Sequence, residues 1–206
     1  SITNAVRVEI VNCVFTNTYG TRPAAGIDIE PNEGQTAEQI SVTDTVCNGN
    51  EGVGLDIVGW CERISGITVS GCSINDNGEA GIRIVNGEQM HISKTTISGN
   101  HTGIEIPRDA NEVEFMDVSV EGNSLRGVSL VTTGQAGNTS GIIFESCAFT
   151  NNSKYSANEL DGIRIDNYDS SGTISDVSFK SCQFTDTQSS KTQRYGLTVG
   201  FSKGIY

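Results

Sequence analysis

The sequence predicts an all-β fold, a single-stranded right-handed parallel β-helix of about seven rungs with three short strands in each rung. A Gly-apolar-x-apolar unit recurs along the whole chain of 206 residues, and a second short apolar pattern precedes each copy. Repeats with a period of about 20 to 50 residues are the sequence signature of stacked solenoids and arrays. We therefore expect residues 1–206 to form one β-helix domain.

The Gly-apolar-x-apolar unit marks one strand of each rung. Successive glycines are 22 to 35 residues apart, by subtraction of their residue numbers. Apolar residues that alternate over so short a run are typical of a strand with one buried face. The seven units begin at Gly26, Gly54, Gly81, Gly103, Gly127, Gly162 and Gly196.

A second strand is expected shortly before each glycine. A small or thiol residue is followed, two positions later, by a large apolar residue, and an Asn or Thr stands three positions further on. A turn Asn can bond neighbouring backbone and tolerates the left-handed conformation, so we expect these residues to stack at one turn. They are Thr18, Asn50, Asn77, Asn100, Asn123, Asn152 and Thr187.

A third strand comes from apolar pairs further upstream. Three strands in each repeat describe a coil with three sides, and one coil cannot bury its own inner face. Stacking buries a continuous column of like residues, in which we expect Phe149 to lie near Phe184. The clearest upstream pairs are Val8/Ile10, Ile40/Val42, Ile67/Val69 and Val177/Phe179.

The six cysteines are interpreted as core residues. Cys13, Cys72, Cys147 and Cys182 fall in one column of the repeat, and no pair has C-x-x-C spacing. Free cysteines are often buried and behave as small hydrophobes, so we expect neither disulfides nor a metal site. Free thiols suit folding in a reducing compartment. Cys47 lies in the adjacent inward column, and Cys61, beside Trp60 in a turn, is the exception.

The charge of the chain limits its partners. The formal net charge is -12, from 13 basic and 25 acidic residues. This argues against nucleic acid, which needs a basic footprint, and it disfavours a strongly anionic polymer unless a cation or a local basic patch mediates. No apolar run approaches the roughly 20 residues of a membrane span. No signal peptide is visible, and residues 1–8 already fit a rung, so we expect a fragment of a longer chain.

The recurring Asn-x-x-x-Gly-Ile-x-Ile unit resembles the parallel β-helix repeat of pectate-lyase-like proteins, over essentially the whole chain. That group includes polysaccharide lyases, glycoside hydrolases, mannuronan epimerases and the tailspike depolymerases of bacteriophages. Residues 26–32, Gly-Ile-Asp-Ile-Glu-Pro-Asn, are similar to a segment of prophage and phage-tail β-helices. The resemblance implies work on carbohydrate without naming the reaction, because this fold hosts several.

The sequence departs from two active-site patterns of that group. Residues 26–32 are loosely similar to the Gly-Phe-Asp-Pro-His-Glu region of mannuronan epimerases, but Asn32 stands near the place of the histidine. The two histidines, His91 and His101, fall in other rungs. The Asp pairs and Gly-His-Gly of polygalacturonases are also absent. These departures count against an epimerase or lyase mechanism of the epimerase kind.

The resemblance implies a substrate groove along one parallel sheet. The middle residue of each Gly-apolar-x-apolar unit should point outward from that sheet, because side chains alternate along a strand. Adjacent rungs are about 4.8 Å apart, so these residues should form a column. The column reads Asp28, Asp56, Arg83, Glu105, Ser129, Arg164 and Thr198.

Asp28, Glu30 and Asp56 are the catalytic candidates. Asp28 and Asp56 are expected to face solvent as like-charged neighbours, and Glu30 lies on the same face about 6.6 Å along the strand. Such carboxylates suit acid/base cleavage of a glycosidic bond, with retention or inversion. Two alternatives stay open: a plain solvated face, or a calcium site completed by the Asn32 carbonyl. No cofactor is required for the hydrolysis.

Substrate-binding candidates flank the carboxylates. Arg83 could hold a sugar hydroxyl or carboxylate, and aromatic rings on long loops could stack on sugars or cap those loops. Longer loops at both ends of the stack should wall the groove. A lower-ranked second site comprises Asp161, Arg164, Asp166 and Asp169, near Tyr168. The full set of binding candidates is Arg83, Glu105, Arg164, Tyr19, Trp60, Tyr155 and Tyr168, with Tyr195 on a further wall.

Three functions follow. The first is a polysaccharide hydrolase, for which the resemblance implies a place in a phage tailspike, on the virion tail or at an extracellular surface. The second is a module that binds glycan, or forms a shaft, without cleavage. The third is a polysaccharide lyase or epimerase. An end rung with unpaired backbone needs a cap, so we expect a homotrimer or neighbouring domains of the same chain as partners, besides the polysaccharide.

Overall fold

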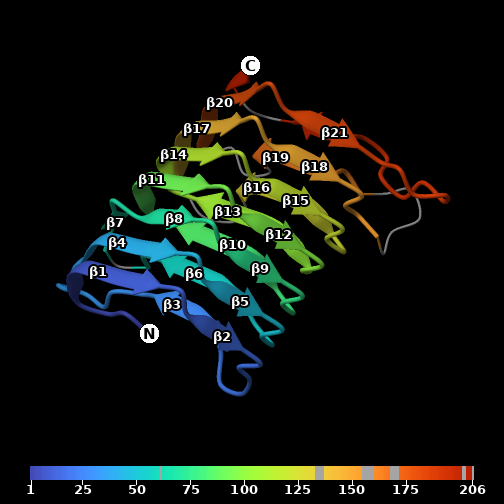
Figure 1. The fold of residues 1–206 in the computed structure, drawn as a ribbon. Coiled ribbons are helices and arrows are strands. Elements are labelled where there is room, and N and C mark those ends of the chain that lie inside the picture. Colours follow the sequence, from blue (N-terminus) through green and yellow to red (C-terminus); the bar gives the residue numbers. More distant parts are fainter. Residues whose placement is uncertain (61, 133–136, 155–159, 168–171, 201–202, 206) are drawn as a thin grey trace.

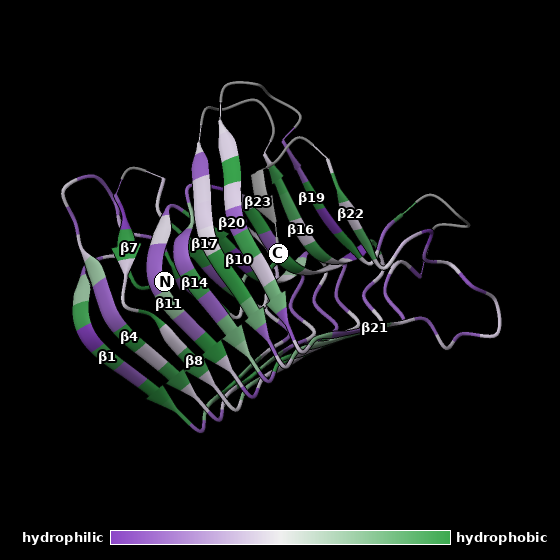
Figure 2. Ribbon diagram, turned by 90° about the horizontal axis from the view of Figure 1, so that it is seen from above, coloured by the Kyte–Doolittle hydropathy of each residue, from purple (hydrophilic) through white to green (hydrophobic). Residues whose placement is uncertain are grey.

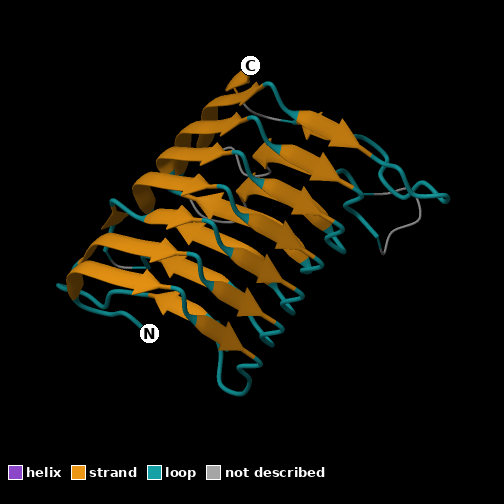
Figure 3. Cartoon of the chain, viewed as in Figure 1, coloured by secondary structure: helices purple, strands orange, loops and turns teal. Residues whose placement is uncertain are grey.

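The computed structural model of the chain describes residues 1–60, 62–132, 137–154, 160–167, 172–200 and 203–205. Strands and connecting turns account for the described residues, and no helix occurs among them (Figure 3). The strands form three parallel sheets, and the chain passes through each sheet once per rung, so that the two termini lie at opposite ends of the stack (Figure 1). The predicted right-handed parallel β-helix of about seven rungs is confirmed.

Sheet A is built from the Gly-apolar-x-apolar units. Its strands pair in parallel and in register, so that each unit lies on the next. A glycine is needed at Gly81 for lack of space, since a Cβ there would lie 2.5 Å from Ile97 Cγ2 and 2.8 Å from the Gly103 carbonyl oxygen. The strands are β3 (Ile27–Ile29), β6 (Leu55–Val58), β10 (Ala80–Val85), β13 (Thr102–Arg108), β16 (Arg126–Thr132), β19 (Ile163–Asn167) and β22 (Leu197–Val199).

Sheet B holds the longest strands and bends at one residue in each rung. That residue has a positive φ, as at Gln39 (54°), Gln89 (53°) and Glu112 (54°), and these positions stack. The strands are β1 (Ala5–Val11), β4 (Ala37–Thr43), β7 (Ile64–Ser65), β8 (Thr68–Ser70), β11 (Gly87–Ser93), β14 (Asn111–Met116), β17 (Asn138–Glu145), β20 (Thr173–Lys180) and β23 (Lys203–Ile205).

Sheet C consists of three-residue strands that follow sheet B after a tight turn. The turn needs one left-handed residue in each rung, which is Asp44 in one rung and Asp117 in another, and Asp tolerates this conformation better than most side chains. The strands are β2 (Val14–Thr16), β5 (Val46–Asn48), β9 (Ser73–Asn75), β12 (Thr96–Ser98), β15 (Ser119–Glu121), β18 (Ala148–Thr150) and β21 (Gln183–Thr185).

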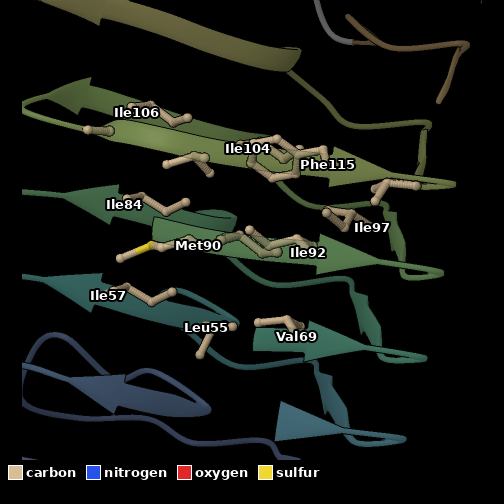
Figure 4. Close-up of a cluster of buried hydrophobic side chains, with 14 of the residues drawn as sticks. Leu55, Ile57, Val69, Ile84, Met90, Ile92, Ile97, Ile104, Ile106 and Phe115 are labelled. Carbon is tan, nitrogen blue, oxygen red and sulfur yellow. The ribbon is translucent and has the colours of Figure 1, made fainter. Parts of the chain in front are cut away.

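The core is the column enclosed by the three sheets. Side chains such as Leu55, Ile84 and Ile92 point inward and are fully buried (Figure 4). Viewed from above, hydrophobic and hydrophilic bands alternate along the strands of sheet B (Figure 2). Aliphatic residues give way to stacked rings toward the C-terminus. The ring centroids of Phe149 and Phe184 are 5.3 Å apart, so these residues are neighbours, as predicted. Like residues therefore stack on like, which keeps successive rungs equal in size.

The cysteines that the structure describes are free thiols, and most of them lie in the core. Cys72 and Cys147 are buried, and each thiol donates to carbonyl oxygens within its own rung and in the rung below. Burial raises the pKa of the Cys47 thiol to about 12 and that of Cys147 to about 11. The interpretation as core is confirmed for Cys47, Cys72 and Cys147, and Cys182 packs against the core; Cys13 is half-buried, and Cys61 lies outside the described residues.

A ladder of buried asparagines runs along the turn between sheets C and A. Asn77 donates from its backbone N–H (3.0 Å) and from Nδ2 (2.8 Å) to Oδ1 of Asn100 on the next rung. Its Nδ2 also donates to the Cys47 carbonyl, and its Oδ1 accepts two bonds from Asn50. Every hydrogen-bonding group of the side chain is thus satisfied inside the protein. The five members are Asn50, Asn77, Asn100, Asn123 and Asn152.

The two ends of the ladder differ from its middle. Thr18 bonds Asn50 Oδ1 at 2.8 Å at the N-terminal end, as predicted. At the other end, Gln193 Oε1 accepts the Asn152 N–H at 2.9 Å, so the prediction of Thr187 in this column was wrong. Thr187 instead bonds the Asn151 side chain. The left-handed residue is also the one before each ladder position, for example Asp76 before Asn77, because that residue turns the chain.

Replacement of Asn100 by Ala should reduce the free energy of unfolding by about 3 kcal/mol, because it leaves the buried Asn77 N–H and the Ile74 carbonyl without partners. Urea unfolding followed by circular dichroism measures the change. The matched control is Thr96→Ala, an exposed position on the same rung, which should change stability by less than about 0.5 kcal/mol. Equal unfolding midpoints for the two variants would contradict a stabilising role for the ladder.

Candidate active site

The outward column of sheet A lies in the predicted register. Asp28 pairs with Asp56, Asp56 with Arg83, and Arg83 with Glu105. The column continues from Glu105 through Ser129 and Arg164 to Thr198. The strand repeat therefore places three carboxylates and one guanidinium on four successive rungs.

Asp56 does not face solvent, contrary to the sequence prediction. It is only 1% exposed, and Arg83 of the next rung binds it through two hydrogen bonds, from Nε at 2.9 Å and from Nη2 at 2.6 Å. Burial raises the pKa of the Asp56 carboxyl, and Arg83 counteracts part of that rise. Asp56 is thus held in an ion pair in the floor of the site. The Arg83 guanidinium, predicted to bind substrate, is already bound to Asp56.

A cleft of about 250 Å³ lies above this ion pair. One wall is the long loop between β2 and β3, whose Arg22 forms an ion pair with Glu79. Another wall is the turn after β6, which carries Trp60. The prediction that long loops wall the groove therefore holds at this end of the stack. The lining residues are Arg22, Pro23, Glu30, Asp56, Trp60, Glu79 and Arg83.

Glu30 is the carboxylate best placed for proton transfer. It follows the last residue of β3, lines the cleft and is partly exposed, so a ligand can reach it. Burial raises the pKa of Glu30, and the charges of Asp28 and Asp56 raise it further, while Arg83 and a hydrogen bond with the Trp60 side chain lower it. A carboxyl group with a raised pKa can carry a proton at the pH where most glutamates have lost theirs.

Arg83 stands at the centre of the acidic residues. Besides its bonds to Asp56, its Nη1 lies 3.6 Å from Glu79 Oε2. Glu105 is the next residue of the column; burial raises the pKa of its carboxyl, while the charge of Arg83 acts in the opposite direction. These contacts make Arg83 a structural counter-ion for the acidic groups around it.

Trp60 offers an aromatic surface at the cleft. Its side chain is 57% exposed, and the guanidinium of Arg108, at the end of β13, lies 5.3 Å from the ring centroid. A cation over an indole face is an attractive arrangement that helps to fix the ring. The structure thus places Trp60, the predicted sugar-stacking residue, in the lining of the same cleft as Glu30.

The other aromatic candidates are not gathered at this cleft. Tyr19 is 86% exposed in the β2–β3 loop and does not line the cleft. Tyr195 lies under the Arg194 guanidinium, 5.2 Å away, near the opposite end of the stack. Tyr155 and Tyr168 lie outside the described residues.

The lower-ranked second site is an ion-pair network. Asp161 is fully buried and binds Arg194 through two contacts of 3.2 Å, while Arg164 lies 3.7 Å from it. Arg164 also binds Asp166 at 2.7 Å. The Asp161–Arg194 pair links the last two rungs, and Arg164 acts as counter-ion to two acidic residues of its own rung. Asp169, the remaining member, lies outside the described residues.

Sequence reasoning missed Arg22, Pro23 and Glu79. The long segment between Thr18 and Gly26 was a signal that a loop covers this part of the sheet, but it did not identify the residue that reaches Glu79. Glu79 lies four positions before Arg83 and just before β10, outside the repeat unit from which the column was read. The positions of Arg22 and Glu79 depend on the conformation of loops outside the repeat.

No group of three or more His, Cys, Asp or Glu side chains is arranged to hold a metal ion within the described ranges. Calcium binding by the Asp28, Glu30 and Asp56 carboxylates with the Asn32 carbonyl stays a prediction. The part of the chain that the structure describes also contains no helix long and apolar enough to cross a membrane.

Replacement of Arg83 by Met should lower the free energy of unfolding by about 3 kcal/mol or more at neutral pH, because it strands the buried Asp56 charge. The pKa of Asp56 is already raised in the fold, so folding favours its protonated form, and the variant should regain stability as the pH falls through that pKa. Urea unfolding at neutral and mildly acidic pH measures both effects.

Two further variants complete that test. The double variant Arg83→Met/Asp56→Leu should recover much of the loss, because it leaves no unpaired charge. Arg63→Met, which breaks the exposed Arg63–Glu88 pair of 3.0 Å, should have little effect at either pH. A loss from Arg83→Met that is small or independent of pH would show that Asp56 does not depend on its partner.

Comparison with known proteins supports the fold. Residues 61–140 match the family described as right handed beta helix region. The A-module of mannuronan C-5 epimerase AlgE4 from Azotobacter vinelandii superposes with a TM-score of 0.63 at 16% identity, covering 100% of this chain and 54% of that one. The AlgE6 A-module of the same organism gives a TM-score of 0.46 at 13% identity, with coverage of 100% and 52%.

The chain spans about half the length of these epimerase modules. A search for curated relatives found no match. At such low identity the likeness concerns the fold alone, and it agrees with the β-helix repeat that the sequence predicted. The chain is a right-handed parallel β-helix.

Proposed function

We propose that this chain processes a polysaccharide in the cleft over sheet A, and that Glu30 is the acid that protonates the leaving oxygen of a glycosidic bond. The observation that carries the proposal is Glu30 itself, a partly buried carboxyl with a raised pKa that lines a cleft beside an exposed indole. Proton donation by a positioned carboxylic acid is a common way to break such a bond.

The second carboxylate of the proposal is Glu79. It replaces Asp56, which the ion pair with Arg83 removes from reach. Glu79 lines the same cleft and forms ion pairs with Arg22 and Arg83. Glycoside hydrolysis needs a second carboxylate besides the acid, which attacks the anomeric carbon itself or activates the water that does so, and Glu79 would take this role. Trp60 supplies the surface on which a sugar ring can stack.

The fold supports the polysaccharide as substrate class. A solved structure with the same fold is named as a mannuronan C-5 epimerase module, a protein that acts on a polysaccharide. A β-helix also suits a long polymer, because its equal rungs offer an extended surface. A place in a phage tailspike, on the virion tail or at an extracellular surface, remains a proposal, as does a homotrimer.

A non-catalytic glycan-binding module is the second candidate function. It is favoured by one observation: the acidic residues around Arg83 are largely engaged with the two arginines, as structural charge networks often are. In that case the Trp60 ring would carry the binding. Lyase or epimerase chemistry is the third candidate, and the product distinguishes it.

Replacement of Glu30 by Gln should abolish cleavage, with a loss of at least about 100-fold in rate, because the amide cannot donate the acidic proton. The assay measures reducing ends released from a panel of bacterial surface polysaccharides, together with ultraviolet absorbance of unsaturated products. Reducing ends without unsaturated product are expected from the parent protein. Its rate should fall as the pH rises through the pKa of Glu30, which lies above the usual glutamate value.

Glu33→Gln is the matched control, an exposed carboxylate three residues further along the same connection, and it should keep the parent rate. Unsaturated product would overturn hydrolysis in favour of a lyase. Full activity of Glu30→Gln would remove Glu30 from the mechanism. Binding of a glycan without any product would favour the non-catalytic module.

A further inference from the structure

We propose that the cleft takes a neutral or amino-substituted polysaccharide rather than a polymer of uronic acids. This inference rests on the proposed function, because it names the substrate class of the same cleft. The preference depends on the charged side chains that line the cleft and on the ion pairs that these side chains already form with one another.

The lining of the cleft is acidic overall. Glu30, Asp56 and Glu79 bring three acidic groups against the two arginines Arg22 and Arg83, so that even with Glu30 protonated as the proposed acid the lining has no positive charge to spare. Asp28 and Glu105 stand next to Asp56 and Arg83 in the same outward column and add two more acidic groups. A sugar carboxylate would therefore enter a site in which acidic groups outnumber basic ones.

Both arginines of the lining are already engaged. Arg83 makes two hydrogen bonds to Asp56, 2.9 and 2.6 Å long, and reaches Glu79 at 3.6 Å. Arg22 binds Glu79 from the opposite wall. Recognition of a carboxylate by Arg is strongest when both oxygens meet the guanidinium fork, and here Asp56 has taken the fork of Arg83. A uronate would have to displace a carboxylate of the protein.

The third guanidinium near the cleft is that of Arg108. It lies over the Trp60 ring, 5.3 Å from the centroid, and so acts on the face that a sugar would use for stacking. It does not line the cleft itself. The contact fixes the ring without providing a pocket for a substrate carboxylate.

The acidic groups suit hydrogen-bond donors. Glu30 and Glu79 line the cleft and are partly exposed, so a sugar hydroxyl or ammonium can reach their carboxyl oxygens. The charges of Asp28 and Asp56 also act on Glu30, as its raised pKa indicates. Sugar hydroxyls and ammonium groups donate to carboxylates, and an ammonium gains the Coulomb attraction as well. The order of preference is therefore amino sugar, neutral sugar, uronate.

Trp60 provides a direct measurement, because it is the one tryptophan of the sequence and it lines the cleft. Its fluorescence is titrated with three β-1,4-linked gluco-configured hexasaccharides: cellohexaose, the glucosamine hexamer and the glucuronate hexamer. These probes share a backbone and differ in charge. At low ionic strength the glucosamine hexamer should bind at least about tenfold more tightly than the glucuronate hexamer, with cellohexaose between them. At about 0.5 M salt the three affinities should converge.

Glu79→Gln is the second variant. This variant removes the carboxylate that pairs with both Arg22 and Arg83. The affinity for the glucuronate hexamer should therefore rise at least about tenfold. Glu33→Gln, on an exposed turn, should leave all three affinities unchanged. Tightest binding of the glucuronate hexamer, equal affinities, or no response to any of the three at millimolar concentration would overturn the proposal.

The two proposals fail separately. Tight uronate binding together with loss of cleavage in Glu30→Gln would leave the proposed function in place and reverse the substrate class. The expected ranking of the three hexasaccharides together with full activity of Glu30→Gln would keep the charge preference and remove the proposed acid.

Discussion

The asparagine ladder is the interaction on which the rest of the structure depends. Each turn from sheet C to sheet A would otherwise bury backbone groups without partners, at a cost of about 1–3 kcal/mol for each group. One amide side chain of each middle rung satisfies its neighbours on both sides, as Asn77 does between Asn50 and Asn100. The ladder therefore fixes the separation and the lateral register of successive rungs at the point where sheet A begins.

That register determines the candidate site. The first five glycines of sheet A, from Gly26 to Gly127, each pack under the ladder amide of the next rung, and a Cβ at Gly81 would lie 2.8 Å from Asn100 Nδ2. With glycine and ladder in place, the residue two positions later has to lie directly over its counterpart. Asp28, Asp56 and Arg83 are aligned for this reason. The alignment of charged groups at the cleft is thus a consequence of packing on the other side of the strand.

The parts of the structure that repeat could be predicted from the sequence, and the parts that depend on single loops could not. The outward column and the Phe149–Phe184 contact follow from the period of the repeat. The burial of Asp56 depends on the side-chain conformation of Arg83, for which the repeat gives no information. Gln193 takes the last ladder position because a loop held by Asp186 brings it there. Such contacts have no counterpart in other rungs.

A column with a spacing of about 4.8 Å imposes a strong constraint on charge. Two carboxylates on neighbouring rungs repel each other, and burial makes that repulsion worse. Arg83 on the third rung resolves the conflict by pairing with Asp56, which leaves Asp28 and Glu30 to act on each other at the cleft. The pairing of Asp56 with Arg83 thus stabilises the acidic floor, and it also leaves neither side chain available to bind a ligand. What remains for a substrate is the partly exposed carboxyl of Glu30, with Glu79 and the ring of Trp60 in the same cleft.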